Sequence, residues 1–221
     1  MKIGIFSDIH ADARSLNKAL KLLERKGVDR LICCGDLVDG ASEGEAACQR
    51  VKGLEIPVVM GNHDLAYSTP RANSMANALR PWRTSVTRRP DDLSEDSIAY
   101  LGSLPRSLEL EYEGVKLILA HANTWDYVSY IFASASSISK VRKLREFVAP
   151  DVSAVILGHT HRPMDTRFQG LRIFNPGSVE GNRHESSRSC AVLTLPSLDF
   201  EVYEIDRDTP LTAASYDFDN F

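Results

Sequence analysis

The chain has 221 residues, of which 43% are hydrophobic and 25% charged, and its formal net charge is −4. This composition is typical of a globular protein that buries its own core, and the acidic balance argues against general binding to nucleic acid or to an acidic membrane. The first residues lead straight into a strand-like segment without the regions of a signal peptide, and no apolar run approaches the ~18 residues that cross a bilayer. We therefore expect a cytoplasmic protein.

Short apolar runs alternate with helical patterns along the chain. Most of the runs are nearly continuous, as in strands covered on both faces, and the last two alternate enough to form a hairpin. Strands are predicted at residues 2–6, 30–34, 57–60, 115–120, 154–157, 172–174, 190–195 and 200–205. Helices are predicted at residues 13–26, 43–52, 71–79, 95–103 and 137–148.

The alternation of strand and helix in the first half is typical of βαβ units and an α/β fold. The region 65–106 interrupts this order and contains four prolines. We interpret it as a helical insertion in one domain that spans residues 1–221, not as a separate domain. The acidic tail after Asp206 contains Tyr216, Phe218 and Phe221, and the sequence leaves docking and disorder of this tail equally open.

The four cysteines show no CxxC spacing, which argues against a zinc ribbon. Cys33 and Cys34 are adjacent in an apolar run, so they are expected on opposite faces of a strand. We predict that all four cysteines are buried free thiols.

Side chains of the kinds that bind metal ions follow five of the predicted strands. These strand-end motifs are Ser7-Asp8-Ile9-His10, Gly35-Asp36-Leu37-Val38-Asp39, Gly61-Asn62-His63-Asp64, His121-Ala122-Asn123 and Gly158-His159-Thr160-His161. In open α/β sheets the binding site lies beyond the carboxyl ends of the strands. We therefore expect these distant motifs to converge.

The spacing and chemistry of these motifs indicate a metal centre. Asp8 and His10 are two positions apart, as are His159 and His161, so in extended chain each pair points to one side. Five of the six histidines lie in these motifs, which packing alone does not explain. Carboxylate, imidazole and carboxamide ligands without thiolate suit Mn, Fe, Co, Ni or Zn. A carboxylate such as Asp36 can bridge two ions.

Taken in order, these motifs resemble the full signature of the calcineurin-like metallophosphoesterase superfamily. The residues that carry the resemblance are Asp8-x-His10, Gly35-Asp36-x-x-Asp39, Gly61-Asn62-His63-Asp64, His121 and Gly158-His159-x-His161, and the match covers roughly residues 1–180. The later Asn175-Pro176-Gly177-Ser178 resembles the loop after the last motif in small bacterial and archaeal members. Ala122 is a departure, because glycine often follows the fourth-strand histidine in the family.

The resemblance implies a four-layer αββα sandwich of two mixed β-sheets flanked by helices. It also implies two divalent transition-metal ions, one bound by Asp8, His10, Asp36 and His161 and the other by Asp36, Asn62, His121 and His159. By the same resemblance Asp36 bridges the ions, and His63 lies near the leaving group with Asp64 orienting it. The implied reaction is hydrolysis of a P–O bond by a metal-bridging hydroxide, with Mn²⁺ among the suitable ions. A phosphodiester is the favoured substrate, and the sequence leaves a phosphomonoester open.

Three further residues have less specific expectations. Asn123 either contacts substrate or fixes its own turn, and Arg183 is a candidate substrate contact in a polar loop. Asp39 is expected to lie behind the metal ligands. The substrate class is a phosphoester small molecule or a nucleotide.

Two other functions fit the same fold. A retromer subunit resembles this superfamily and acts as an interaction scaffold, so a catalytically silent, metal-binding scaffold is the main alternative. A protein Ser/Thr phosphatase ranks third, because those enzymes usually have more chain for substrate grooves. The complete ligand set together with His63 favours the enzyme.

Overall fold

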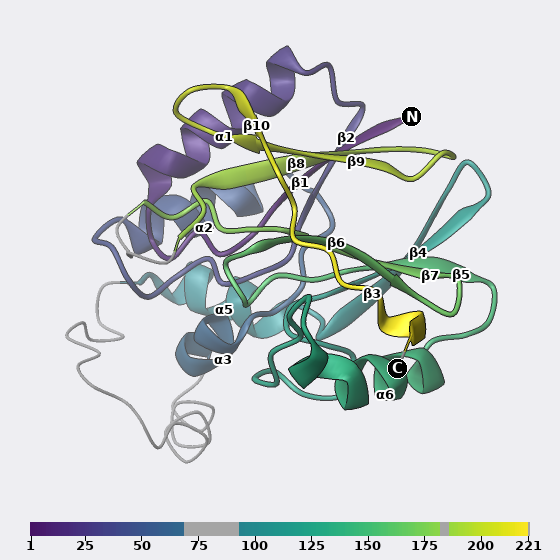
Figure 1. Cartoon of the computed structure of the whole chain (residues 1–221). Helices are drawn as coiled ribbons and strands as arrows, with labels where there is room; N and C mark the ends of the chain where they lie inside the picture. Colours follow the sequence, from purple (N-terminus) through teal and green to yellow (C-terminus); the bar gives the residue numbers. More distant parts are fainter. Residues whose placement is uncertain (69–92, 182–185, 221) are drawn as a thin grey trace.

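A computed structural model describes residues 1–68, 93–181 and 186–220, and two five-stranded mixed sheets form its centre (Figure 1). The first sheet has the order β10-β9-β8-β1-β2, with β1 at Lys2–Phe6, β2 at Arg30–Cys33, β8 at Ser189–Thr194, β9 at Asp199–Glu204 and β10 at Thr209–Leu211. The second has the order β3-β4-β5-β7-β6, with β3 at Ser107–Tyr112, β4 at Val115–Ala120, β5 at Val152–Ile156, β6 at Pro163–Phe168 and β7 at Leu171–Pro176.

Helices cover the outer faces of both sheets. They are α1 at Ala13–Arg25, α2 at Gly44–Lys52, α3 at Asn62–Ser68, α5 at Glu95–Ser103 and α6 at Ile138–Phe147, with 3₁₀ turns η2 at Ala135–Ser137 and η3 at Phe218–Asn220. α1 and α2 pack on the first sheet, and α6 packs on the second (Figure 1). The expected four-layer αββα sandwich is confirmed.

The core has three parts because each sheet is buried on both faces. In β1, Ile3 and Ile5 point into the layer between the sheets, where they pack with Leu117 and Ile156 of the second sheet. Phe6 points the other way, into the layer beneath α1. This double burial explains why the central strands read as continuous apolar runs.

Parallel pairing orients the ends that carry the site. β1 pairs in parallel with β2, and β5 pairs in parallel with β4 and β7, so these strands end at the same edge of their sheets. β8 and β9 form the antiparallel hairpin expected from their alternation. The βαβ order correctly predicts the β1–β2 pair, while both sheets as a whole are mixed.

The sequence prediction misses the short and edge strands. Residues 57–60 make one parallel bridge, between Val58 and Cys33, where a strand was expected. β3 and β6 were not predicted, because both are edge strands in which exposed or half-exposed polar residues interrupt the apolar pattern. The predicted helix at 71–79 lies outside the described residues.

The acidic tail docks on the second sheet. Thr166 of β6 donates a hydrogen bond from Oγ1 to the Tyr216 carbonyl at 2.5 Å, and the amide of Asp165 donates to the Ala214 carbonyl at 2.9 Å. Phe218 is fully buried beneath this contact. Of the two outcomes the sequence left open for the tail, the structure has docking; Phe221 lies outside the described residues.

Two expectations from composition can be compared with the structure. The four cysteines are free and buried, as predicted. Among the helices in the described ranges, each is too short or too polar to cross a membrane.

The docked tail should contribute to stability through Phe218. Phe218→Ala is expected to lower the free energy of unfolding by about 3–5 kcal/mol, because it removes a fully buried aromatic side chain. Phe147→Ala is the control, since Phe147 is 58% exposed and its loss should cost far less. Urea unfolding followed by circular dichroism measures both, and equal stability of the two variants would contradict the docking.

Candidate metal centre

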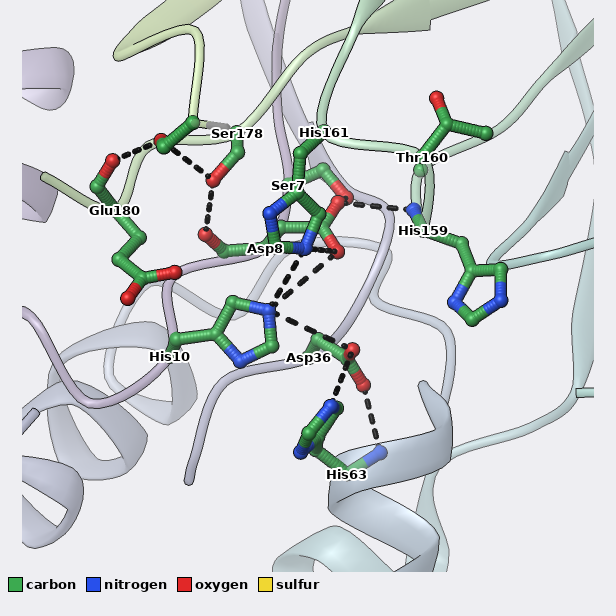
Figure 2. Close-up of polar contacts among 12 residues, drawn as sticks. Ser7, Asp8, His10, Asp36, His63, His159, Thr160, His161, Ser178 and Glu180 are labelled. Atoms are coloured by element: carbon green, nitrogen blue, oxygen red, sulfur yellow. Dashed lines mark hydrogen bonds and ion pairs between the residues drawn. The ribbon is translucent and has the colours of Figure 1, made fainter. Parts of the chain in front are cut away.

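Side chains from the strand ends lie close together, and Figure 2 shows Asp8, Asp36 and several of the histidines. β1 leads into Asp8 and His10, β2 into Asp36, residues 57–60 into Asn62 and His63 at the start of α3, β4 into His121, and β5 into His159 and His161. β1 and β2 belong to the first sheet and β4 and β5 to the second. The predicted convergence of the five motifs therefore occurs where the ends of both sheets meet.

One group of potential ligands combines Asp8, His10 and His161. His161 Nε2 lies 3.2 Å from Asp8 Oδ1 and 3.0 Å from His10 Nε2. His10 Nε2 lies 3.8 Å from the same Asp8 oxygen. All three ligand atoms fall within 4.8 Å of one another, which is close enough for one ion to contact them all.

A second group combines Asp36, His121 and His159, whose ligand atoms also lie within 4.8 Å of one another. His121 Nε2 is 3.2 Å from Asp36 Oδ2 and 3.2 Å from the side-chain oxygen of Asn62. Asn62 therefore lies beside this group, on the side where the family resemblance places it.

Asp36 lies between the two groups. Its Oδ2 atom is 3.8 Å from His10 Nε2, on the side of the first group, and 3.2 Å from His121 Nε2 in the second. Asp36 also forms a possible ligand group with His10 and His63. A carboxylate in this position can contact two ions at once.

Main-chain carbonyls select which nitrogen each imidazole presents. His10 Nδ1 lies 2.9 Å from the Asp39 carbonyl oxygen, and His121 Nδ1 lies 2.7 Å from the Cys34 carbonyl oxygen. A carbonyl oxygen only accepts, so each Nδ1 carries the hydrogen and donates it. Both rings therefore direct Nε2 toward the carboxylates, which is the arrangement that a metal-binding histidine needs.

Burial and neighbouring charges together set the pKa values at this site. Burial acts to raise the pKa of Asp8, but the charge of His161 lowers it, and the net value is well below the ordinary range. Burial lowers and Asp36 raises the pKa of His121, to about 10. Burial, with His121, lowers the pKa of His159 to about 4. The two carboxylates therefore favour positive charge in the cluster.

The residues present fit divalent metal ions. Asp8 Oδ2 accepts hydrogen bonds from Ser7 Oγ at 2.5 Å and from the His159 amide at 3.0 Å. Asp8 Oδ1 is buried, makes no hydrogen bond and faces the imidazoles. A buried carboxylate oxygen without a hydrogen bond is stabilised by a cation beside it. The surrounding nitrogen and oxygen donors suit the transition metals named from the sequence.

Two glycines leave space for these carboxylates. A Cβ atom on Gly61 would lie 2.0 Å from Asp36 Oδ1, and one on Gly158 would lie 2.1 Å from Ser7 Oγ and 2.8 Å from Asp8 Oδ2. The glycines that precede the ligand candidates in the sequence thus permit close backbone approach.

The structure pairs His63 with Asp39 instead of Asp64. His63 Nδ1 lies 2.6 Å from Asp39 Oδ2. The Asp64 carboxylate accepts hydrogen bonds from the amides of Asp36, Leu37 and Gly61 at 2.7–3.0 Å, so it anchors the Asp36 loop. The expectation that Asp64 orients His63 does not match these contacts, in which Asp39 holds the His63 ring. The expectation that Asp39 lies behind the ligand candidates agrees with the structure.

Of the two candidate substrate contacts, Asn123 lies within the residues that the structure describes. The Asn123 side chain accepts from the amides of Trp125 and Asp126 and donates to Asp126 and to the Ser129 carbonyl. Its amide thus holds its own loop, which favours the turn-fixing alternative. Arg183 lies outside the described residues.

Ser178 has a role in this site that the sequence did not assign. Its hydroxyl donates to the Asp8 carbonyl at 3.0 Å, and the amide of Val179 donates to the Ser7 carbonyl at 2.9 Å (Figure 2). The loop after β7 therefore holds the end of β1. The Asn-Pro-Gly-Ser motif marked this loop, but its spacing gave no indication of the partner.

Residues 1–197 match the model of the calcineurin-like phosphoesterase superfamily domain, and the chain belongs to this superfamily. It is 24% identical over 212 residues to an uncharacterized protein, MJ0912, of Methanocaldococcus jannaschii, covering 90% of this chain and 84% of that protein. The family is metal-dependent, in agreement with the His and Asp groups found here.

Solved structures share the fold. A metallophosphoesterase from Sphaerobacter thermophilus is similar with a TM-score of 0.71 and 22% identity, over 96% of this chain and 89% of that one. A novel archaeal phosphodiesterase gives a TM-score of 0.55 and 18% identity, over 96% and 100%. Vacuolar Protein Sorting 29 from Cryptosporidium parvum gives 0.53 and 17%, over 96% and 95%.

The close approach at Gly61 yields a test of the metal centre. Gly61→Ala should weaken metal binding by about ten-fold or more, because the added Cβ displaces the Asp36 carboxylate. Gly102→Ala is the matched control, since the nearest atom to its Cβ would lie 3.7 Å away. Titration of the chelator-treated proteins with Mn²⁺, followed by calorimetry, measures the difference. Equal affinities would show that Asp36 is not a ligand.

Proposed function

We propose that the chain is a phosphodiesterase that works with two divalent transition-metal ions, one at each ligand group and with Asp36 between them. The observation that carries the proposal is the convergence of Asp8, Asp36 and four imidazoles from separate strand ends, with a buried Asp8 oxygen that lacks a hydrogen bond. Membership of a phosphoesterase superfamily supports the reaction class. Bound ions supply Lewis acidity toward the phosphoryl oxygens and favour ionisation of water.

The side chains of this chain have distinct tasks in that reaction. Asp8 and Asp36 place negative charge where the ions bind, and the neighbouring imidazoles complete the two groups. His63 lies at the edge of the cluster, with Nε2 3.8 Å from Asp36 Oδ2 and Nδ1 held by Asp39. His63, when protonated, would stabilise the developing charge or donate a proton to the leaving oxygen, a type of help typically worth about 10² to 10⁴ in rate.

A metal-binding scaffold is the second candidate function, supported by the likeness to Vacuolar Protein Sorting 29. Binding to a partner protein requires neither Nε2 atoms directed at buried carboxylates nor a histidine paired with Asp39. Both features are present here, which favours the enzyme. Turnover by metal-loaded protein separates the two candidates.

Metal-dependent turnover is the first expectation from this proposal. Chelator-treated protein should not hydrolyse bis-p-nitrophenyl phosphate, and Mn²⁺ should restore turnover, because the N/O ligand set suits such an ion. Release of p-nitrophenolate is the readout, with Mg²⁺ and Zn²⁺ compared in parallel. Folded, metal-loaded protein that turns over no phosphoester in a broad panel would rule out the enzyme.

His63→Ala should separate chemistry from metal binding. We expect both metal ions to remain bound and kcat to fall by about 10² or more, with the largest loss for poor leaving groups, which need a proton most. Asp36→Ala is the matched comparison, because it should lose metal as well as turnover. Metal analysis by mass spectrometry and kcat for good and poor leaving groups decide the point. Loss of an ion from His63→Ala would instead make His63 a ligand, as its grouping with His10 and Asp36 allows.

A further inference from the structure

A cavity of about 460 Å³ is lined by Asp39, the residue that contacts His63 at the edge of the metal centre. Its walls come from the loop after β2, the first turns of α2, Tyr67 of α3 and Leu93. α2 and α3 both pack against α5, which holds these walls together. The volume is within the range of about 300–1,000 Å³ that is usual for small-molecule sites.

The cavity adjoins the site on the side of His63. Asp39 lines the cavity, and the same carboxylate contacts His63 Nδ1 through Oδ2 at 2.6 Å and the Tyr67 hydroxyl through Oδ1 at 3.3 Å. Asp39 therefore joins the cavity to His63, the histidine assigned here to the leaving-group oxygen of the substrate.

Gly44 keeps the floor of the cavity open. It is the first residue of α2 and does not have the positive φ that would require glycine, and glycine within a helix costs about 1 kcal/mol relative to alanine. A Cβ atom there would meet Leu93 at 3.5 Å, Ala11 at 3.6 Å and Val38 at 4.0 Å. These are ordinary contacts, so the methyl group of alanine fits, whereas a larger side chain at position 44 would fill the apolar floor.

The charge of the walls restricts what the cavity accepts. Among its described lining residues are three carboxylates, Asp39, Glu43 and Glu45, and no lysine or arginine. Glu43 pairs with the exposed Arg14, with Nε and Oε1 3.1 Å apart. The remaining walls are largely apolar. Such a cavity repels a leaving group that carries phosphate and admits an uncharged one.

We propose that this cavity, here called the leaving-group pocket, binds an uncharged leaving group of nucleoside size. The inference rests on the proposed function and adds the substrate class to it. In the reaction the oxygen of water forms a new bond to phosphorus, the bond from phosphorus to the leaving oxygen breaks, and the leaving oxygen departs with a proton.

Three substrates test the proposal on Mn²⁺-loaded protein: bis-p-nitrophenyl phosphate, adenylyl-(3′→5′)-adenosine and diadenosine tetraphosphate. Wild-type protein should prefer adenylyl-adenosine, whose leaving nucleoside is uncharged, over diadenosine tetraphosphate by about ten-fold or more in kcat/KM. Gly44→Leu should lower kcat/KM for adenylyl-adenosine by about ten-fold or more relative to bis-p-nitrophenyl phosphate, because it fills the floor. Gly44→Ala, the matched control, should stay close to wild type.

Adenosine binding gives a readout that needs no turnover. Calorimetric titration of chelator-treated protein with adenosine should show binding to wild type and Gly44→Ala, and at least about ten-fold weaker binding to Gly44→Leu. Preference for diadenosine tetraphosphate, or equal adenosine binding by all three proteins, would overturn the leaving-group pocket. Absence of turnover on every substrate would count against the proposed function instead, and the adenosine titration then decides the pocket by itself.

Discussion

Two buried carboxylates, Asp8 and Asp36, are the constraint on which the rest of the site depends. They are 0% and 1% exposed, and a charge buried to that degree is costly unless opposite charge or hydrogen bonds accompany it. The ends of two sheets bring imidazoles to them from β4 and β5, and the amides of His63 and His159 donate to them. Even so, Asp8 Oδ1 makes no hydrogen bond. The surrounding structure therefore fixes two anions in place with imidazole nitrogens facing them, an arrangement that suits a bound cation.

The backbone of the site shows a related cost. Five of the proposed ligands have a left-handed backbone conformation although none is glycine: Asp8, His10, Asp36, His159 and His161, with φ between 49° and 66°. Each such residue costs roughly 1–2 kcal/mol relative to the right-handed conformation. Strain concentrated in this way persists only where the surrounding structure enforces it, and it is typical of functional sites. Here both sheets are packed on both faces, and this packing holds the backbone at the strand ends in place.

The positions of the ligand candidates could be predicted because they follow from local features. Asp8, His121 and His159 come just after strands whose apolar runs are evident in the sequence, and parallel strands end at a common edge. The partner of His63 could not be predicted in this way. Asp64 follows His63 directly in the sequence, and Asp39 belongs to the motif after β2. Which of them contacts His63 depends on how the loop after β2 folds against α3. Edge strands such as β6 were missed because pairing, not hydrophobicity, defines them.

The partners of His10 and His121 are main-chain carbonyls, those of Asp39 and Cys34. A substitution at position 34 or 39 changes the side chain but leaves its carbonyl oxygen in place. The backbone alone therefore fixes the imidazole tautomer that can bind metal through Nε2. This tautomer is kept when neighbouring side chains are substituted. His63 has no such protection, because it is held through the side chain of Asp39. If His63 acts in hydrolysis as proposed, one substitution at Asp39 would end catalysis in a descendant protein and leave its metal ligands intact, so hydrolysis would be lost in evolution before metal binding.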